Sequence, residues 1–518
     1  MKTKYIMIVA AVMAYGPLAA QETYENAKIV TEELNGTARY VATGGALDAL
    51  GAELSTSSTN PAGIGLFRHS KVEGSIGMVM QQDASDYEHG DDHSVSFDQA
   101  GFVYANRTGD DSFFNFAFNY HKSRNFNYIL SAADKLNNSS QNKLSYVKLA
   151  NGNLYPFVSD NGFNTFKPYL SCNQLDDIYT NNLFYASGED VAYYYPATEY
   201  LFDRAHEGYV GEYDFTFSGN IKDRVYLGLT ASINDVHYSH VSDHTEAISP
   251  NPENIDYLNV YDRRDITGTG VGLKAGVIFR PVEYAPLLMG LSISTPIWYR
   301  LTSSNYTEVS DGNYTVPAEE SYKYKVFTPW KFGANIGYTV DQYLALGVTY
   351  EFADYSAMNN RINDNGDYYY YENYESSHAD RVMNDHTKRT LRGVNTLKVC
   401  AEVKPIPEIA IRAGYNYVSP MYKSSAFKDG TLDSNGSYYA SATDFTNWKA
   451  TNRFTCGLGF RYGQLNFDLA YQYSKTDGDF YPFMSYIDKD FEDWNNVAGP
   501  VKVSNKRHQI LCSVGYTF

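Results

Sequence analysis

Residues 344–352 read Leu-Ala-Leu-Gly-Val-Thr-Tyr-Glu-Phe. The Leu, Val, Tyr and Phe residues occupy alternate positions and therefore share one face of an extended strand, while Ala, Gly, Thr and Glu share the other. Residues 453–461 and 465–473 alternate in the same way. This alternation predicts strands that present one apolar face and one polar face.

The period-two pattern begins near residue 70 and continues to the end of the chain. It predicts an all-β fold with fourteen strands. A soluble β-sandwich alternates as well, so the period alone does not distinguish a sandwich from a membrane barrel. The expected strands are 70–82, 93–107, 112–124, 208–219, 222–240, 264–281, 286–302, 321–340, 342–354, 388–404, 408–419, 448–462, 464–476 and 501–518.

The lengths of the connections distinguish the two architectures. Short turns such as 108–111 and 220–221 alternate with long connections such as 241–263 and 355–387, and the longest connection covers 125–207. Short turns on one rim and long loops on the other are typical of a bacterial outer-membrane barrel. The sequence therefore predicts a 14-stranded antiparallel transmembrane β-barrel formed by residues 69–518, with both chain ends on the short-turn, periplasmic rim.

Charge decides which face of each strand contacts lipid. A Lys or Arg that faces lipid at mid-membrane costs roughly 2–4 kcal/mol, so Lys274, Lys398, Arg412 and Arg453 are expected to point into the lumen. The apolar faces then contact the outer-membrane lipids. The chain ends on Phe518, and a terminal aromatic residue resembles the signal that the barrel-assembly machinery recognises.

The first residues predict export. Lys2 and Lys4 precede the apolar stretch 6–14, and a small-residue cleavage site follows, so residues 1–20 are expected to form a cleaved signal peptide. No later run of about 18 apolar residues occurs, which excludes transmembrane helices. The net charge of −18 argues against nucleic acid as a partner.

The segment before the first strand has a different composition. Residues 44–67 read Gly-Gly-Ala-Leu-Asp-Ala-Leu-Gly-Ala-Glu-Leu-Ser-Thr-Ser-Ser-Thr-Asn-Pro-Ala-Gly-Ile-Gly-Leu-Phe, so most side chains are small and few are charged. A wide barrel leaks unless it is filled, and small residues can pack closely against its wall. We therefore expect a hatch (plug) inside the lumen, with a turn formed by Asn60, Pro61, Ala62 and Gly63.

Two roles remain open for this hatch, which spans residues 21–68. It can gate transport by shifting within the barrel, or it can be a static filler that is needed only for folding. The glycine-rich, hinge-like composition favours gating, because a static plug needs no hinge.

Inward-facing charges are candidates for ligand binding. Arg453, Arg412, Lys274 and Glu351 form this set, and an arginine among them can bind a carboxylate. Arg453 is the preferred candidate because its position on the strand is near mid-depth. The alternative is a lining of ion pairs without a ligand, which is common in barrel lumens.

The long connection 125–207 contains a helical pattern. Leu175, Ile178, Tyr179 and Leu183 recur at the spacing of one helix face. This face can form an apolar groove that captures hydrophobic ligands outside the membrane. It can equally pack the loop onto the rim without binding anything.

The sequence contains no recognisable catalytic or cofactor-binding set. The eleven His residues are scattered, so no Ser-His-Asp set can be assembled from spacing. Cys172, Cys400, Cys456 and Cys512 lack CxxC spacing and are expected to be free thiols. We expect no enzyme activity, no cofactor and no metal site.

Four stretches resemble the long-chain fatty-acid transporter (FadL, toluene-transporter-like) family of outer-membrane proteins. They are Asn60-Pro61-Ala62 in the hatch and residues 290–296, 344–356 and 396–417 in the barrel. The resemblance covers roughly residues 44–518 in order and implies a hatch-filled barrel that passes hydrophobic molecules. Family members release the ligand sideways where an early strand kinks inward. The expected strand 112–124 contains no Gly or Pro, so the sequence does not locate this opening.

The resemblance implies an outer-membrane channel for passive uptake of hydrophobic small molecules, with long-chain fatty acids as the expected substrate and the hatch as the gate. The alternative is a FadL-like barrel that serves as a binding or shuttle partner for exported proteins or lipids, as in type IX secretion. The connection 125–207 would then be a docking surface. A lipid hydrolase would need a nucleophile at the rim, and the sequence indicates none.

Overall fold

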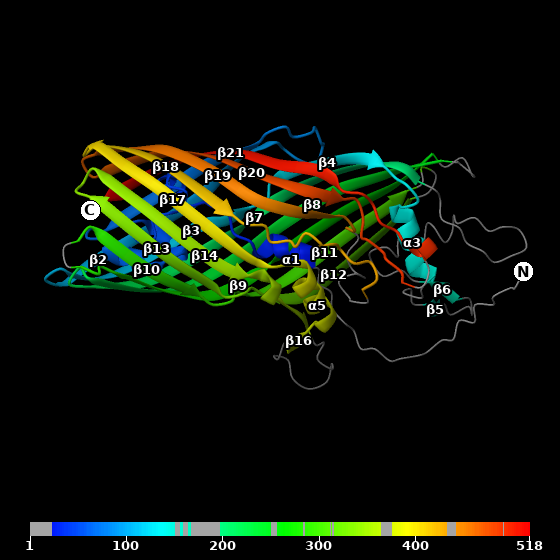
Figure 1. Ribbon diagram of the computed structural model, residues 1–518, viewed down its shortest axis with the longest axis horizontal. Coiled ribbons are helices and arrows are strands. Elements are labelled where there is room, and N and C mark those ends of the chain that lie inside the picture. The colour runs from blue at the N-terminus through cyan, green and yellow to red at the C-terminus, as the bar shows by residue number, and fades with distance from the viewer. Residues whose placement is uncertain are drawn as a thin grey trace, which may run out of the picture.

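The computed structural model describes residues 23–150, 156–158, 164–166, 197–249, 256–282, 285–310, 312, 315–363, 376–432, 442–489 and 492–518. Within these residues the chain forms a barrel with its N-terminal segment inside (Figure 1). The expected signal peptide lies outside the described residues. The same holds for the expected capture helix with Leu175, Ile178, Tyr179 and Leu183.

Fourteen antiparallel staves form the wall, which confirms the number expected from the sequence. The wall closes because β21 (Val501–Thr517) pairs with β1 (Lys71–Gln81) along its length. The uninterrupted staves between them are β2 (His93–Gly109), β7 (Ala197–Ile221), β8 (Val225–Ile248), β9 (Tyr257–Phe279), β18 (Ile409–Val418), β19 (Phe445–Tyr462) and β20 (Leu465–Tyr481).

The other staves are each built from two elements in succession. These are β3 (Ser112–Asn125) with β4 (Tyr128–Lys135), β10 (Leu287–Ser294) with β11 (Trp298–Ser310), β12 (Thr315–Phe327) with β13 (Lys331–Val340), β14 (Leu344–Asp354) with β15 (Asn359–Asn363), and β16 (Ser377–Ala379) with β17 (Gly393–Ile406). Short helices fill two of the interruptions, namely η3 (Tyr355–Ala357) and α5 (Arg381–Thr390).

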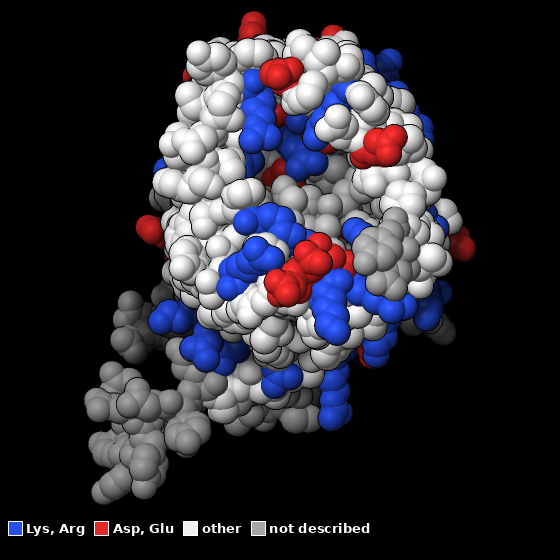
Figure 2. Space-filling view, turned by 90° about the vertical axis from the view of Figure 1, so that its left-hand side faces the viewer, with Lys and Arg blue, Asp and Glu red and all other residues white. Residues whose placement is uncertain are grey.

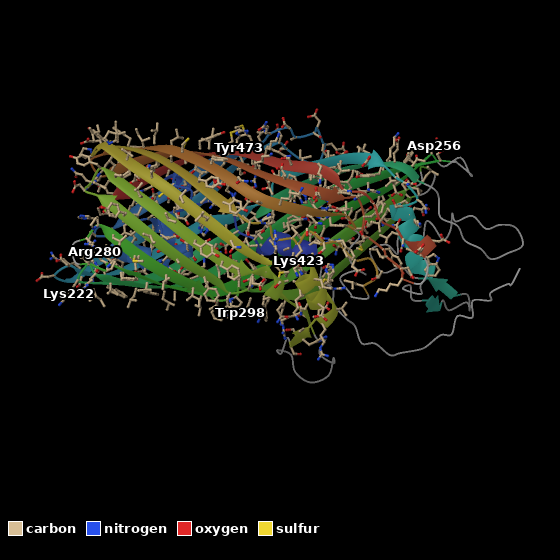
Figure 3. All side chains as sticks on the ribbon, viewed as in Figure 1. Lys222, Asp256, Arg280, Trp298, Lys423 and Tyr473 are labelled. Atoms are coloured by element: carbon tan, nitrogen blue, oxygen red, sulfur yellow. The ribbon has the colours of Figure 1, made fainter. Side chains whose placement is uncertain are left out.

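The two rims differ as the sequence indicates. Tight turns join the staves at one end, where the Phe518 N–H donates a hydrogen bond of 2.9 Å to the Ser70 carbonyl. Lys222 and Arg280 lie at this short-turn rim, whereas Asp256 lies at the far tip of the opposite, outer rim (Figure 3). The outer rim also carries α3 (Gln141–Ala150), the small hairpin of β5 (Pro156–Val158) and β6 (Asn164–Phe166), and η4 (Glu492–Trp494).

Several connections are shorter than the sequence predicts, because the strands continue beyond the expected ends. β8 continues to Ile248 and β9 begins at Tyr257, so most of the expected loop 241–263 is strand. Most of 303–320 likewise belongs to β11 and β12. Beyond the membrane both strand faces carry polar residues, so the apolar alternation that marks a strand disappears there.

Two further boundaries were wrong. The expected connection 125–207 contains β4 and the outer part of β7, which begins at Ala197. The expected strand start at Lys388 lies in α5, which Asp380 caps by accepting a hydrogen bond from the Met383 N–H. Such a cap favours helix at this position over the strand that the neighbouring residues predict.

The assignment of the two strand faces is confirmed. Apolar residues such as Leu346, Val348 and Phe454 are exposed on the outside of the barrel. Viewed from the short-turn rim, charged side chains gather around the hollowed centre (Figure 2). The expected inward cations Lys274, Lys398, Arg412 and Arg453 are all buried. No helix among the described residues is long and apolar enough to cross a membrane.

The N-terminal segment lies inside the barrel, drawn in blue in Figure 1. It contains α1 (Thr23–Val30), α2 (Ala38–Ala42), η1 (Leu54–Ser58) and η2 (Pro61–Leu66). Asn60 caps η2 by accepting a hydrogen bond of 3.2 Å from the Ala62 N–H, and Pro61 occupies the first helical position. The small residues therefore fold into short turns that fit the lumen.

Glycines in the wall provide seats for this segment. A Cβ atom on Gly228 would lie 2.2 Å from the carbonyl carbon of Pro61, and one on Gly276 would lie 1.9 Å from Asn60 Oδ1. Such contacts are possible only because glycine has no side chain. The same relation holds for wall residues Gly347, Gly414 and Gly457, which face hatch residues Ala46, Gly44 and Ala42.

Candidate lumen binding site

A cavity of about 320 Å³ lies in the lumen beside α1. Its lining combines the hatch with inward-facing residues of β3, β4, β17, β19, β20 and β21. This volume is within the range of about 300–1,000 Å³ that is usual for small-molecule sites. The cavity is therefore large enough to hold a small organic ligand.

One side of the cavity is aromatic. Tyr24 of α1 stacks on Tyr422 with ring centroids 5.0 Å apart, and its ring lies 5.1 Å from that of Phe445. Trp448 and Tyr128 also line the cavity, with centroids 5.9 Å apart in an edge-to-face arrangement. Aromatic faces of this kind bury apolar ligand surface at little conformational cost.

The lining also carries several cations, most of them paired with carboxylates. Arg507 lies 3.2 Å from Glu33, and Lys398 lies 2.7 Å from Glu351. Lys331 pairs with Glu32 of the hatch. The pairs of Arg507 with Glu33 and of Lys331 with Glu32 hold the hatch segment that precedes α2 against the wall, whereas Lys398 and Glu351 join two wall strands.

Two arginines at the cavity differ from this pattern. Arg453 donates a hydrogen bond of 3.0 Å to the neutral Asn416 amide oxygen, and it forms no ion pair with a carboxylate of the described residues. Arg124 donates to Thr31, while its Nε is buried with no hydrogen-bond partner in the described part of the chain. Both guanidinium groups can therefore accept an anionic ligand.

The structure separates the four residues that the sequence proposes for ligand binding. Arg453 and Glu351 line the cavity. Arg412 instead binds Glu402 and Asp468 at 2.6 Å and 2.5 Å, and Lys274 pairs with Glu212. Their participation in ligand binding stays a prediction.

Sequence reasoning missed Arg124, Lys331 and Arg507. Arg124 stands at the last position of an expected strand, where the inward or outward direction of a side chain is least certain. Lys331 and Arg507 gain their importance from Glu32 and Glu33 of the hatch. No signal in the strands themselves identifies these partners.

The hatch is tied to the wall by shared groups. Arg39 Nε lies 3.1 Å from Glu402, the carboxylate that Arg412 also binds. Asn60, predicted as a hatch residue, is fully buried and donates a hydrogen bond of 3.3 Å to Asn335 of β13. Pro61, Ala62 and Gly63 are buried beside it.

The outer end of the hatch contacts α5. The hydroxyl of Thr23 lies 2.8 Å from His386 Nδ1 and 2.9 Å from the hydroxyl of Thr387. Burial lowers the pKa of His386, which favours the neutral imidazole. This contact places the first residues of the hatch beneath the outer rim.

The pairing between β2 and β3 stops on the outer half of the wall. Their ladder ends at the pair Gln99 and His121, and beyond it the described part of β2 pairs only with β1. β3 bulges between Lys122 and Arg124 and then breaks before β4. On the neighbouring β7, Gly208 marks the position of this break. It has a φ of 100°, and its carbonyl accepts a hydrogen bond from the Phe126 N–H.

Within the described residues, no group of three or more His, Cys, Asp or Glu side chains could hold a metal ion. Cys400 is a buried free thiol, and Cys456 and Cys512 are exposed free thiols on the outside of the barrel. Cys172 lies outside the described residues.

No protein-family model matches the sequence, and no curated protein matches it. Among solved structures, the barrel is similar to a FadL homologue from Pseudomonas aeruginosa, with a TM-score of 0.51 and 12% identity over 94% of this chain and 99% of that chain. The Ralstonia pickettii toluene transporter TbuX gives a TM-score of 0.48 at 12% identity, with the same two coverages. The first comparison confirms the fold inferred from the residues.

Proposed function

We propose that this chain, which has the fold of a FadL homologue, is an outer-membrane channel for the passive uptake of hydrophobic small molecules. Long-chain fatty acids are the substrate class that best fits its lumen. The observation that carries the proposal is the cavity beside α1, which combines an aromatic side with two arginines that are not paired with carboxylates.

The two sides of the cavity suit the two ends of an amphiphile. An alkyl chain gains free energy by leaving water for the aromatic side, at about 25 cal/mol per Å² of buried apolar surface. A carboxylate head group can form a charge-assisted hydrogen bond with Arg453. Arg453 and Trp448 both come from β19 and both line the cavity, so one strand contributes an aromatic ring and a cation.

The hatch divides into a seated part and an arm, which have different attachments. Residues 37–67, the seated part, rest against the wall glycines and share the carboxylate of Glu402. Residues 23–36, the arm, pack Tyr24, Ile29 and Val30 into an apolar cluster with the wall. Ion pairs of Glu32 with Lys331 and of Glu33 with Arg507 add polar contacts. We propose that the arm moves when ligand enters, whereas the seated part stays in place.

The break in pairing between β2 and β3 offers a route out of the cavity. His121 and Asn125, at its inner edge, also line the cavity. A ligand that moves past them reaches the membrane without crossing the seated hatch. Release of the ligand into the membrane avoids the cost of exposing an alkyl chain to water.

Uptake of radiolabelled palmitate tests the proposal in cells that lack the gene and in cells that carry it on a plasmid. We expect faster uptake with the protein, and equal rates would reject the function. The Arg453→Met variant should raise the KM for palmitate because the carboxylate loses its charged partner. Uptake of radiolabelled toluene, which has no charge, should be unaffected.

Arg461→Met is the matched control because Arg461 lies on the same strand but is exposed at the short-turn rim. It should behave as the unmodified protein with both probes. An unchanged KM for palmitate in the Arg453→Met variant would reject the assigned role of Arg453, even if uptake itself is observed.

A further inference from the structure

The wall is interrupted a second time, in the two staves formed by β10 with β11 and β12 with β13. Residues 295–297 separate β10 from β11, and residues 328–330 separate β12 from β13. Opposite them, β9 pairs with β10 as far as Lys274 and resumes pairing with β11 at Val271. The three residues 295–297 therefore lie opposite only two residues of β9, 272 and 273.

Prolines account for the interruption. Pro296 and Pro329 have no N–H group to donate to a ladder, so neither can continue a regular strand pairing. Threonine hydroxyl groups accept the bonds instead. The Leu273 N–H donates to Thr295 Oγ1 at 3.0 Å, and the Ile297 N–H donates to Thr328 Oγ1 at 2.8 Å.

A void of about 20 Å³ lies at this seam, which is room for about one water molecule. Its lining includes Leu273, whose side chain is exposed on the outside of the barrel, and Val30, which belongs to the hatch inside. The void therefore lies in the wall between the hatch and the outer surface. Two backbone hydrogen bonds still cross the seam, from the Thr295 N–H to the Leu273 carbonyl at 2.9 Å and from the Thr328 N–H to the Ile297 carbonyl at 3.1 Å.

One ion pair lies between the void and the lumen cavity. Glu32 and Lys331, which bind each other, both line the cavity and both line the void. Their contact joins the arm of the hatch to β13. If the pair separates, the two spaces become continuous.

Two tryptophans indicate the depth of the seam relative to the membrane. Trp298 follows Ile297 directly, and Trp330 follows Pro329; their side chains are 40% and 49% exposed. Figure 3 shows Trp298 at the outside of the wall, between the two rims. Exposed tryptophans on a barrel mark the boundary between acyl chains and head groups. The seam is therefore at the edge of the outer leaflet.

We propose that this seam is a second lateral port, through which hydrophobic molecules pass between the lumen cavity and the outer leaflet, with Glu32 and Lys331 as its latch. This inference rests on the proposed function and adds a route to it. A ligand carboxylate in the cavity competes with Glu32 for Lys331. An acidic amphiphile in the cavity therefore separates Glu32 from Lys331 and so opens the seam to its own passage.

Photo-cross-linking with a diazirine-bearing palmitate tests the port in cells that express the protein. Adducts are mapped by mass spectrometry with and without excess unlabelled palmitate. We expect adducts that excess palmitate suppresses at Val30 and Ile297, on the inner side of the seam, in addition to adducts near His121. Suppressible adducts near His121 alone, in cells that take up palmitate, would overturn the port and leave the proposed channel intact. Absence of uptake would overturn both.

Substitutions at the latch and the void sharpen the test. Glu32→Gln weakens the latch and should increase the Ile297 adduct, whereas Asp265→Asn, which alters an ion pair with Arg263 that lines neither space, should not. Gly272→Ala adds a methyl group 3.2 Å from Ile297 and should suppress the seam adducts.

Gly219→Ala is the control for the filled void, because nothing lies within 4 Å of the added Cβ. If the two ports carry similar flux, Gly272→Ala should lower palmitate uptake by about half. Seam adducts that are unchanged by both Glu32→Gln and Gly272→Ala would contradict the proposal.

Discussion

The contact between Gly276 and the hatch gives a direct way to release the hatch from its seat. In the Gly276→Ala variant the new Cβ would lie 1.9 Å from Asn60 Oδ1, far inside van der Waals contact. Asn60 must move, which breaks its hydrogen bonds with the Ala62 N–H and with Asn335. At about 1 kcal/mol for each bond and about 1–3 kcal/mol for overpacking, the seated state loses about 3–5 kcal/mol.

This loss changes the population of displaced hatches by a large factor. Since 1.4 kcal/mol corresponds to a factor of ten, the displaced state becomes roughly 100-fold to 4,000-fold more populated. The assay is ion conductance of the purified barrel in a planar bilayer. We expect frequent large openings with Gly276→Ala, and the conductance of the unmodified protein with Gly219→Ala.

Barrel assembly must be checked in the same samples, by the shift in gel mobility that heating causes. A Gly276→Ala barrel that assembles normally and conducts no more than the unmodified protein would refute the reasoning. The hatch would then either tolerate the methyl group without leaving its seat, or contribute nothing to closing the lumen.

Other predictions concern stability. Arg412→Met removes the partner of Asp468 and one of the partners of Glu402, so it should destabilise the folded barrel by about 3 kcal/mol. The measurement is the midpoint of thermal unfolding, which should fall. An unchanged midpoint would show that hatch contacts compensate. Burial lowers the pKa of His386 in the folded barrel below its ordinary 6.5, so the unfolded chain binds the proton first as the pH falls. The stabilising contribution of the neutral imidazole is therefore complete above pH 6.5 and is lost as the pH falls below that value. Stability should therefore decline on acidification, and His386→Gln should reduce this dependence; an identical pH profile in the variant would contradict the assignment.

The sequence determines the membrane-embedded part of the barrel more completely than the rest. Between lipid and lumen, each strand must alternate, because a charge toward lipid is costly and an apolar side chain toward lipid is favourable. Lys398 and Leu346 obey this rule and were correctly placed. Beyond the membrane both faces meet water, so the outer half of β8 up to Ile248 carries no comparable pattern.

The candidate site was only partly predictable, because it depends on residues that are distant in the sequence. Arg453 was recognised from its position on a strand. Its significance comes from its neutral hydrogen-bond partner, Asn416, because no carboxylate of the described residues forms an ion pair with it, whereas Arg507 is paired with Glu33 of the hatch. Likewise, the stacking of Tyr24 on Tyr422 joins the start of the hatch to a connection near the end of the chain. Sequence spacing cannot reveal such pairs.

The central claim is that the lumen cavity holds a hydrophobic ligand with an acidic head group. A cryo-EM map of the purified barrel, prepared with and without palmitate, tests this most directly. We predict elongated density beside Tyr24 and Trp448 that appears only with palmitate and ends at Arg453. A cavity that contains no such density, in a sample whose palmitate is found only around the outside of the barrel, would contradict the account.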